Sequence, residues 1–510
     1  MTAPAARRYL ELATNPQVCE SFALHPVGPK RYALAQATLL PAAPVRCDES
    51  AVPTLGEFLR EASGLTRAQW LTGLDLLPMS HSLETVPDAR WLTGIRRAVA
   101  SGGAHYSTEL YAATGTDGLH HYDPAGHRLE CLDSGDARDT LLTGLIDPPP
   151  YRPDLVLCLS TVFYRHAGAY GEMGYRIGCL DIGVHAAHVL ATARRHRWTA
   201  MLHLRFADSA LDRLLGLDSL RESVQAVITI DCHGRLSMGN SRRHRHRRRG
   251  HSLVPGVGRE TSAVAPAMDG GLPLTLTLHQ ASGVHRPAAI PQPARLPDWP
   301  AVTATVDLPR HDPVPRIRAA SARHSPVRGF EARPIEAGQL GHVLRATAAG
   351  SLTGDETTPI GLAGLFCGIN HVIGVPPGVY RYVPERHALL RVGEGDRYRA
   401  FVHAAMAPLA REGFRNAAAW LLPVGDYEHW LARHGDRGYR MHTMAGGVAA
   451  QVVCDAAYGL GISARIHCDF LTGVADQILG IDTTAGQSLL VVQIGHERPS
   501  GGRPQRLLRC

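Results

Sequence analysis

The sequence has no apolar run long enough to span a membrane and no paired-cysteine motif. No segment approaches the roughly 18 apolar residues of a membrane helix, and the first residues lack the apolar core of a secretory signal. The ten cysteines are scattered along 510 residues, and none forms a Cys-x-x-Cys pair. We therefore expect a cytoplasmic protein with reduced thiols and no membrane segment.

Net positive charge is scarce outside one short segment. The formal net charge is +7, and six positive charges lie in the tract 242–249, together with two histidines. A basic run without interleaved aromatic residues is more often a solvated loop than a nucleic-acid surface. We expect no nucleic-acid partner.

No group of residues has clear metal-ligand spacing. His185 and His188 lie three apart, but no carboxylate or cysteine accompanies them at ligand spacing. Core or capping histidines explain this pattern better than a zinc site does. We predict no metal.

The chain carries the same pattern twice. Gly-Tyr-Arg ends at Arg176 and again at Arg440, and the segment 215–218 recurs at 479–482 with the same spacing, which we call the repeat interval. Upstream, a Tyr-x-Pro-x-x-His-x-Leu pattern begins at Tyr122 and recurs at Tyr382, at nearly the same spacing. Solenoid repeats run about 20 to 50 residues. The repeat interval is several times longer and therefore indicates duplicated domains.

At 510 residues the chain can form two or three domains. We predict five segments: an accessory region at 1–84, copy one at 85–235, a linker at 236–312, copy two at 313–497 and a tail at 498–510. Proline, arginine and histidine enrich the linker, which favours an extended chain. Within it, residues 272–279 alternate like a short strand.

Each copy combines a long helix with a sheet. The Gly-Tyr-Arg motifs open helices, and in copy one apolar residues recur at helical steps from Ile177 to Ala191. The copy-two helix is small and apolar over 444–450, which allows another helix to approach closely. β-branched runs at 226–230 and 490–494 predict buried strands. The fold class is α+β.

Three segments carry candidate binding groups. The first supplies guanidinium forks and a hydroxyl suited to a phosphate, with a solvated basic turn as the alternative. The second has glycines that would let backbone amides approach a ligand, with a helix C-cap as the alternative. The third is a turn of small residues. In this order they comprise Arg323, His324, Ser325 and Arg328; Gly459, Leu460 and Gly461; and Ser101, Gly102 and Gly103.

Together these segments resemble the nitroreductase-like flavoprotein superfamily, especially its SagB/ThcOx-type azoline peptide dehydrogenases. The resemblance covers 85–235 and 313–497. It implies two tandem nitroreductase-like domains that form an intramolecular pseudo-dimer and bind FMN between them. The arginine pattern and the Gly-Leu-Gly segment come from copy two, and the Ser-Gly-Gly turn from copy one, which has no clear arginine pattern. This implies one composite flavin site and one decayed site.

Catalysis in the family typically uses a Lys-Tyr pair before the Gly-Tyr-Arg helix, whereas this chain has Ala169 and Tyr170 there. Azoline oxidation needs a base for the ring Cα proton and an acceptor for hydride, which FMN supplies. Tyr170 is the candidate base or proton relay, with His166 or Arg165 as a cation that lowers its pKa. Packing over the flavin is the alternative role for Tyr170.

The resemblance predicts an FMN-dependent enzyme that oxidises thiazolines or oxazolines to azoles in a ribosomally made peptide. Its partners would be an azoline-bearing precursor peptide and a cyclodehydratase. Two alternatives remain: an NAD(P)H-dependent nitroreductase or flavin reductase, and a flavin-free scaffold in a peptide-modifying complex, which Ala169 would suit.

Overall fold

The structure is a computed structural model that describes most of both copies and parts of the remaining chain. The described residues are 3–12, 30, 37–40, 54–71, 92–115, 117–234, 236, 272–284, 304–310, 323–326, 329–350, 352–353, 359–360, 362–393, 395–406, 408–468, 470–481, 486–498 and 505–507. Arg328 therefore lies outside the described residues.

The first half is built on a seven-stranded antiparallel sheet in the order β1-β6-β5-β4-β7-β9-β8. Its strands are β1 (Ala37–Leu39), β4 (Thr108–Thr114), β5 (Gly118–Asp123), β6 (Arg128–Asp133), β7 (Leu155–Val162), β8 (Thr199–His203) and β9 (Glu222–Asp231). The helices of this half are α4 (Arg138–Thr143), α5 (Phe163–Tyr170), α6 (Met173–Arg195) and α7 (Asp208–Leu215), with the short turn η3 (Gly102–Ala104).

The second half repeats the plan around an antiparallel sheet in the order β10-β17-β16-β14-β18-β21-β19, with β20 paired to β18. Its strands are β10 (Thr305–Asp307), β14 (Gly364–Ile369), β16 (Gly378–Val383), β17 (Ala388–Arg391), β18 (Ala419–Gly425), β19 (Ser463–His467), β20 (Gln487–Ser488) and β21 (Val491–Gly495). The helices are α9 (Ala337–Ala349), α10 (Arg397–Ala400), η5 (Phe401–Ala405), α11 (Pro408–Asn416), α12 (Tyr427–His434), α13 (Arg437–Gly459) and α14 (Thr472–Leu479).

Smaller elements lie outside the two main sheets. β2 (Leu65–Leu71) pairs with β3 (Leu92–Arg97) and with β22 (Gln505–Leu507), so segments near both ends of the chain share one sheet. The other elements are α1 (Pro4–Leu12), α2 (Leu55–Ser63), α8 (Pro273–Ala281), β11 (Ile335–Glu336), β12 (Leu352–Thr353), β13 (Pro359–Ile360) and β15 (Val372–Ile373). Over the described part of the chain, no helix is long and apolar enough to cross a membrane.

The predicted duplication is visible in matching local structures. Both Tyr-x-Pro-x-x-His-x-Leu segments are hairpins in which the tyrosine hydroxyl and the histidine Nδ1 share a hydrogen bond, 2.9 Å for Tyr122 and His127 and 2.8 Å for Tyr382 and His387. Both histidines have left-handed backbone φ, +45° and +49°. β1, in the predicted accessory region, and β10, in the predicted linker, extend the two sheets in equivalent places beside β6 and β17.

The predicted strand at 272–279 is wrong, because this segment forms the helix α8. Pro273 occupies its first turn. The Glu172 carboxylate accepts hydrogen bonds from the backbone N–H groups of Leu274 and Thr275, at 2.9 and 2.8 Å. This cap comes from copy one and satisfies helix N–H groups that local sequence leaves open. A tertiary contact therefore overrides the alternating pattern.

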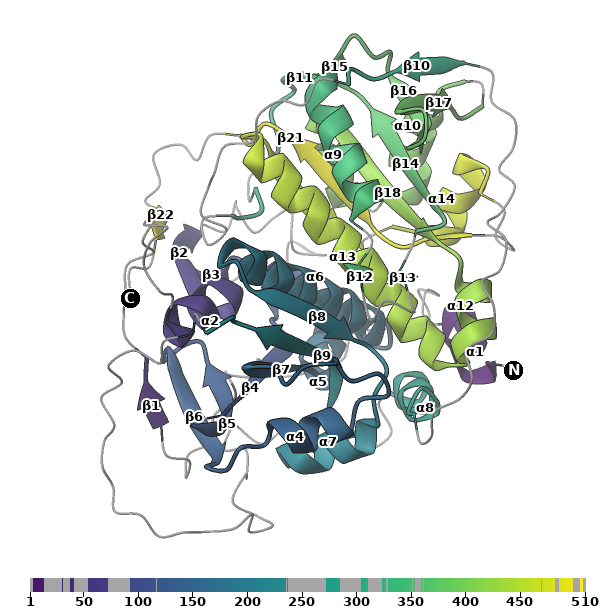
Figure 1. Cartoon of the computed structure of the whole chain (residues 1–510). Helices are drawn as coiled ribbons and strands as arrows, with labels where there is room; N and C mark the ends of the chain where they lie inside the picture. The colour runs from purple at the N-terminus through teal and green to yellow at the C-terminus, as the bar shows by residue number, and fades with distance from the viewer. Residues whose placement is uncertain are drawn as a thin grey trace.

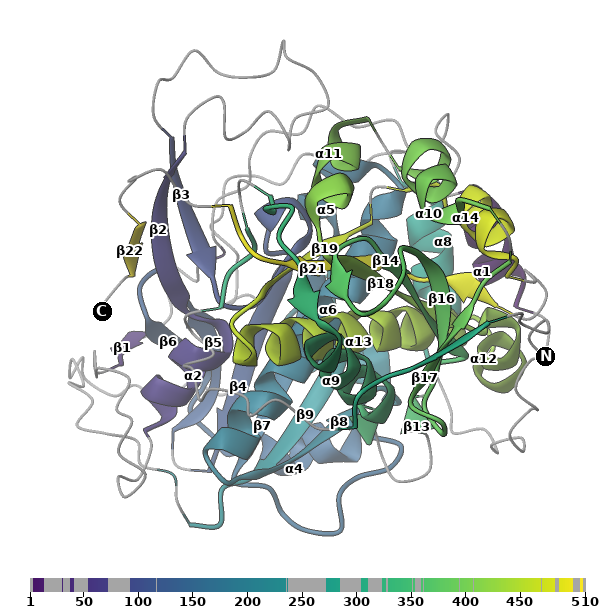
Figure 2. The same ribbon diagram turned by 90° about the horizontal axis from the view of Figure 1, so that it is seen from above.

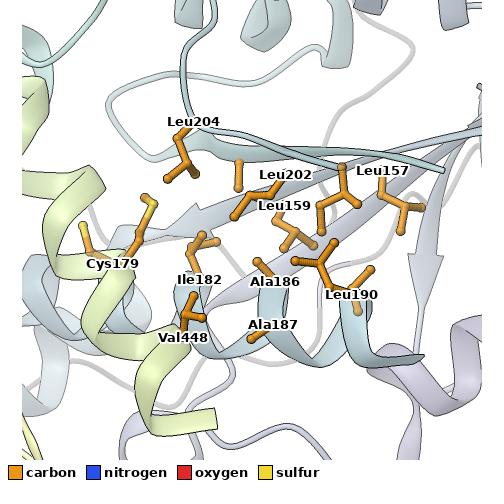
Figure 3. Close-up of a cluster of buried hydrophobic side chains, with 14 of the residues drawn as sticks. Leu157, Leu159, Cys179, Ile182, Ala186, Ala187, Leu190, Leu202, Leu204 and Val448 are labelled. Carbon is orange, nitrogen blue, oxygen red and sulfur yellow. The ribbon is translucent and has the colours of Figure 1, made fainter. Parts of the chain in front are cut away.

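Both predicted Gly-Tyr-Arg helices are confirmed, as α6 and α13, and they pack side by side between the two sheets (Figure 1). On the outer side of α13, α9 packs against it (Figure 2). α6 covers the first sheet through Ile182 and Leu190, which pack against Leu157 and Leu159 of β7, while Val448 of α13 joins the same cluster (Figure 3). The core is therefore continuous from one half to the other.

The helices cross at two equivalent glycines, which are separated by the repeat interval. A Cβ on Gly183 would overlap the backbone carbonyl oxygen of Met444, and a Cβ on Gly447 would overlap that of Leu180. Leu180 and Met444 are themselves separated by the repeat interval. The contact is therefore reciprocal, as in a two-fold dimer.

The paired arginines repeat this reciprocity. Arg176 Nη2 donates to the carbonyl oxygens of Ser488 and Leu489 in the second half, at 3.1 and 2.9 Å. Arg440 donates to Asp208 and, at 3.5 Å, to Gln225 in the first half. The repeat interval also separates Gln225 from Leu489. An arginine of each half thus donates hydrogen bonds to carbonyl or side-chain oxygens of the other half.

Adding a methyl group at the helix crossing should destabilise the protein. We expect Gly183→Ala and Gly447→Ala each to lower the free energy of unfolding by about 1–3 kcal/mol or more, because the obstructing atom is helix backbone. Denaturant unfolding measures this. Gly473→Ala is the matched control: Gly473 is helical, no heavy atom lies within 4 Å of an added Cβ, and alanine should be neutral or gain up to about 1 kcal/mol. Equal stability of all three variants would contradict the crossing.

Two equivalent buried aspartates should make the protein less stable as the pH rises. Burial raises the pKa of Asp212 to about 7 and that of Asp476 to about 6. The folded state therefore binds these protons more tightly than the unfolded chain, and stability declines from about pH 4, the ordinary carboxyl range, up to the folded values. We expect Asp212→Asn to remove part of this decline, at about 1.4 kcal/mol for each unit of pKa difference. Parallel stability curves of variant and parent between pH 4 and 8 would refute this.

Candidate functional site

Asp181, in the middle of α6, gathers the small-residue turn and the end of α5. Ser101 Oγ donates to its Oδ2 at 2.5 Å, and the backbone N–H of Gly102 donates to its Oδ1 at 3.0 Å. His166 Nε2 lies 3.0 Å from Oδ2. Sequence reasoning missed Asp181, although it is the single acidic residue of α6. The structure thus brings predicted residues from two separate segments together around a residue that was not predicted.

Three aromatic rings meet at this cluster. The ring centroids of His105 and Tyr170 lie 5.8 and 6.0 Å from that of His166, and they are 5.8 Å from each other. His105 is exposed and Tyr170 is half-buried, whereas His166 is fully buried beneath them. Partial desolvation of the His105 ring by its neighbours, and then the neighbouring His166, lowers the pKa of His105. These neighbours therefore favour the neutral form of its imidazole.

The glycines of the turn make this close approach possible. A Cβ on Gly102 would overlap the side chain of Ile177, and one on Gly103 would lie 2.7 Å from the Tyr170 hydroxyl and from ring atoms of His105. Gly103 has φ +57°. The glycines are therefore required by neighbouring side chains of the protein itself.

The turn continues in strained backbone that several contacts hold in place. Ala104 and Tyr106 have φ values of +58° and +50°, which non-glycine residues rarely adopt. The N–H of Tyr106 donates to Ser101 Oγ at 2.9 Å, and Arg165 Nη1 donates to the Tyr106 carbonyl at 2.9 Å. Such over-determined strain is typical of functional sites.

Arg165 is already paired with a carboxylate. Its guanidinium lies 2.6 Å from Glu109, and both side chains are buried. This guanidinium and the buried His121, whose Nε2 lies 3.0 Å from Glu109, hold the pKa of Glu109 well below its usual range, against the cost of burial. Arg165 and His166 were the two cations predicted near Tyr170. Since Arg165 pairs with Glu109, His166 is the one that remains as a neighbour for Tyr170.

Arg323 of the second half reaches the first half beside the turn. Its Nη1 donates to the carbonyl of Ala98 at 2.9 Å, three residues before Ser101, and its Nη2 donates to Ser325 Oγ at 3.2 Å. The side chain is buried, and its Nε has no hydrogen-bond partner among the described residues. A buried guanidinium with an unsatisfied N–H is suited to an anion.

Further charged groups surround Arg323. His324 Nε2 lies 2.7 Å from Glu497 Oε2. Burial lowers the pKa of Arg67, on β2, and the positive charge of Arg323 lowers it further, while Glu497 and Tyr458 raise it. Sequence reasoning missed Arg67, because nothing in the predicted accessory region linked it to Arg323. The local charge balance of two guanidiniums against one carboxylate suits a phosphate.

The predicted Gly-Leu-Gly segment ends α13 next to this cluster. Gly461 has φ +76°, and its N–H donates to the Tyr458 carbonyl at 3.1 Å, as in a glycine C-cap. The Leu460 carbonyl accepts from Gln339 Nε2 at 3.4 Å. The C-cap alternative therefore describes the backbone of Gly461, while Tyr458, one residue before Gly459, acts on the pKa of Arg67.

The residues around Arg323 suit the phosphate of FMN, whereas polar groups of the Ser101–Gly103 turn already bind another residue of the protein. The orphaned Nε of Arg323 and the surplus positive charge suit the cofactor phosphate. At the turn, the Ser101 hydroxyl and the Gly102 N–H both bind Asp181. The cofactor contacts predicted for Ser101, Gly102, Gly103, Gly459, Leu460 and Gly461 remain predictions.

The equivalent place in the second half has different residues. One repeat interval along the chain, Trp430 replaces His166, His434 replaces Tyr170 and Ala445 replaces Asp181. The Trp430 ring stacks on His434 and on His442, with centroids 5.3 and 5.4 Å apart. The group of His166, Tyr170 and Asp181 in the first half is thus replaced by aromatic packing in the second. Across the described residues, no group of three or more His, Cys, Asp or Glu side chains is placed to hold a metal.

Comparison with known proteins identifies the fold. No protein-family model matches the chain. A segment of 165 residues, 31% of this chain, is 28% identical to a "putative nitroreductase" of Methanocaldococcus jannaschii, and covers 81% of that protein. A chain of the E. coli microcin synthetase McbBCD complex matches 39% of this chain and 69% of its own length at 15% identity, with a TM-score of 0.27, which is too low to support an inference.

One match that spans nearly the whole chain is a crystal structure of a "putative nitroreductase" from Anabaena variabilis. It has a TM-score of 0.72 and 20% sequence identity, and it covers 98% of this chain and 100% of that one. Both halves are included in this match. The chain therefore has a nitroreductase-like α+β fold in a tandem two-domain arrangement.

Proposed function

We propose that this protein is an FMN-dependent oxidoreductase that oxidises thiazoline or oxazoline rings to azoles in a ribosomally made peptide. The observation that carries the proposal is the acid–base cluster of Tyr170, His166 and Asp181 on the first half, beside the turn that Arg323 of the second half reaches. Azoline oxidation needs a protein group that removes a carbon-bound proton. A simple flavin reductase does not need one.

The residues divide between cofactor and substrate. Arg323 and Ser325, with His324 and Arg328, would hold the phosphate of FMN, and bound FMN supplies the hydride acceptor. Tyr170 is half-buried at the edge of the cluster and would face the ring that is oxidised. The substrate would be a precursor peptide whose rings a cyclodehydratase forms beforehand.

Two other functions each have one supporting observation. Similarity to the Methanocaldococcus protein favours an NAD(P)H-dependent nitroreductase or flavin reductase. The engagement of Ser101 and Gly102 by Asp181 favours a flavin-free scaffold. Rapid bleaching of bound flavin by NAD(P)H without peptide would support the first. A colourless protein that cannot be reconstituted with FMN would support the second.

Loss of Arg323 should weaken FMN binding. We expect Arg323→Ala to cost about 1.5–3 kcal/mol of binding free energy, the range for a hydrogen bond to a charged group, and Arg328→Ala to cost a similar amount. Fluorescence titration with FMN measures both. Arg152→Ala is the control, since Arg152 makes exposed ion pairs with Asp136 and Asp139. Unchanged FMN affinity in both site variants would refute the phosphate assignment.

The azoline activity has a direct test. We expect purified protein loaded with FMN to remove two hydrogens from each ring of a synthetic peptide that carries thiazolines, because the ring becomes aromatic. Mass spectrometry of the peptide measures the loss, and a visible spectrum establishes one flavin per chain. The same peptide with already oxidised thiazoles is the control. No mass change with thiazoline or oxazoline peptides would remove this function.

A further inference from the structure

No lysine can supply the base at this site. The chain contains one lysine, Lys30. Its Nζ is buried, lies 2.5 Å from Glu222 Oε2 and donates to the Tyr111 hydroxyl at 2.8 Å, inside the first half. Arg165 cannot serve either, because guanidinium stays protonated in proteins. The proton acceptor must therefore come from other residues.

Tyr170 alone is a poor base at neutral pH. A phenol has a pKa of about 10, so its hydroxyl is protonated at pH 7 and can take a proton only if it passes its own to a neighbour. The ring of His166 contacts that of Tyr170, with centroids 6.0 Å apart. His166 is an imidazole, the side chain best matched to proton transfer near pH 7.

Asp181 fixes the protonation pattern of His166. An ionised carboxylate only accepts hydrogen bonds, so the 3.0 Å contact requires the proton on Nε2. Ser101 Oγ and the Gly102 N–H also donate to Asp181 and hold its carboxyl group in place. His166 Nδ1 is buried and has no hydrogen-bond partner among the described residues, so Tyr170 does not donate to it in this structure. Catalytic hydrogen bonds often form only when substrate is bound. Nδ1 is therefore left as a proton acceptor.

We propose that Asp181 is a positioning residue that keeps His166 protonated on Nε2, so that Nδ1 accepts the hydroxyl proton of Tyr170 while Tyr170 takes the Cα proton of the azoline. This proposal rests on the proposed function. The Cα–H bond breaks and its proton goes to Tyr170 Oη, whose own proton goes to His166. Bound FMN would supply the acceptor for the hydride of the adjacent ring carbon, and loss of the proton and the hydride would leave a carbon–carbon double bond in the ring.

The second half provides an internal contrast. It keeps the equivalent helices and the reciprocal glycine contact, yet Ala445 and Trp430 stand where Asp181 and His166 stand in the first half. The fold therefore does not require the Asp–His pair. This separates a structural role for Asp181 from the role proposed here.

The test is Asp181→Asn, which preserves shape but can present an amide N–H to His166 and shift the proton to Nδ1. The assay mixes FMN-loaded protein with a thiazoline peptide under anaerobic conditions. We expect the rate constant of flavin bleaching at saturating peptide to fall at least about 100-fold. The peptide concentration that gives half of this rate, and the FMN affinity, should change little. The rate constant in His166→Gln should fall similarly, and that in the double variant no further. Asp212→Asn is the matched control, since Asp212 also accepts from a serine hydroxyl and a backbone N–H, at 2.8 Å each.

A second measurement is independent of activity. Nitrogen-15 histidine NMR, with His166 assigned by its loss in His166→Gln, should show the Nε2–H tautomer in the parent and the Nδ1–H tautomer in Asp181→Asn. An Nδ1–H tautomer or doubly protonated His166 in the parent at neutral pH would overturn the proposal. An unchanged rate constant of flavin bleaching in Asp181→Asn would also overturn it. If the parent does not oxidise the peptide, the proposed function fails, and the tautomer result still decides the role of Asp181.

Discussion

The close crossing of α6 and α13 is the contact on which the rest of the structure depends. Each helix is the core of its own half and also the surface that meets the other half. At Gly183 and Gly447 the backbone of the other helix occupies the space that a side chain would otherwise fill. Wider spacing would open both cores at once, because Leu180 and Val184 of α6 pack among the residues of the second half. Fusion of the halves in one chain makes this interface permanent.

The same crossing determines where the candidate site forms. Asp181 lies two residues before Gly183, and Cys454, which contacts Arg323 Nη2 at 3.7 Å, lies two helical turns beyond Gly447. α6 therefore contributes Asp181, which contacts His166, and α13 contributes Cys454, which contacts Arg323. Arg323 connects them through the carbonyl of Ala98. A site shared between halves is thus a direct consequence of helix packing.

Much of the fold could be predicted from the sequence, because duplication and helical periodicity are local signals. The repeat interval located both long helices, and the small residues at 444–450 correctly indicated a close helix approach. The strand predicted at 272–279 was wrong because the cap of helix α8 comes from Glu172, about a hundred residues away. Asp181 and Arg67 were missed for the same reason: their partners are distant in sequence, and only the folded chain brings them together.

The two copies differ in chemistry but not in architecture. The glycine crossing, the interdomain arginines and the buried pair Asp212 and Asp476 occur in both halves. The Asp–His pair occurs in one, and the other has Trp430 stacked between two histidines. Replacing buried charged groups by well-packed residues is often neutral or stabilising. The residues found in the second half are therefore compatible with a stable fold, whereas a larger residue at either glycine would destabilise the contact between the halves.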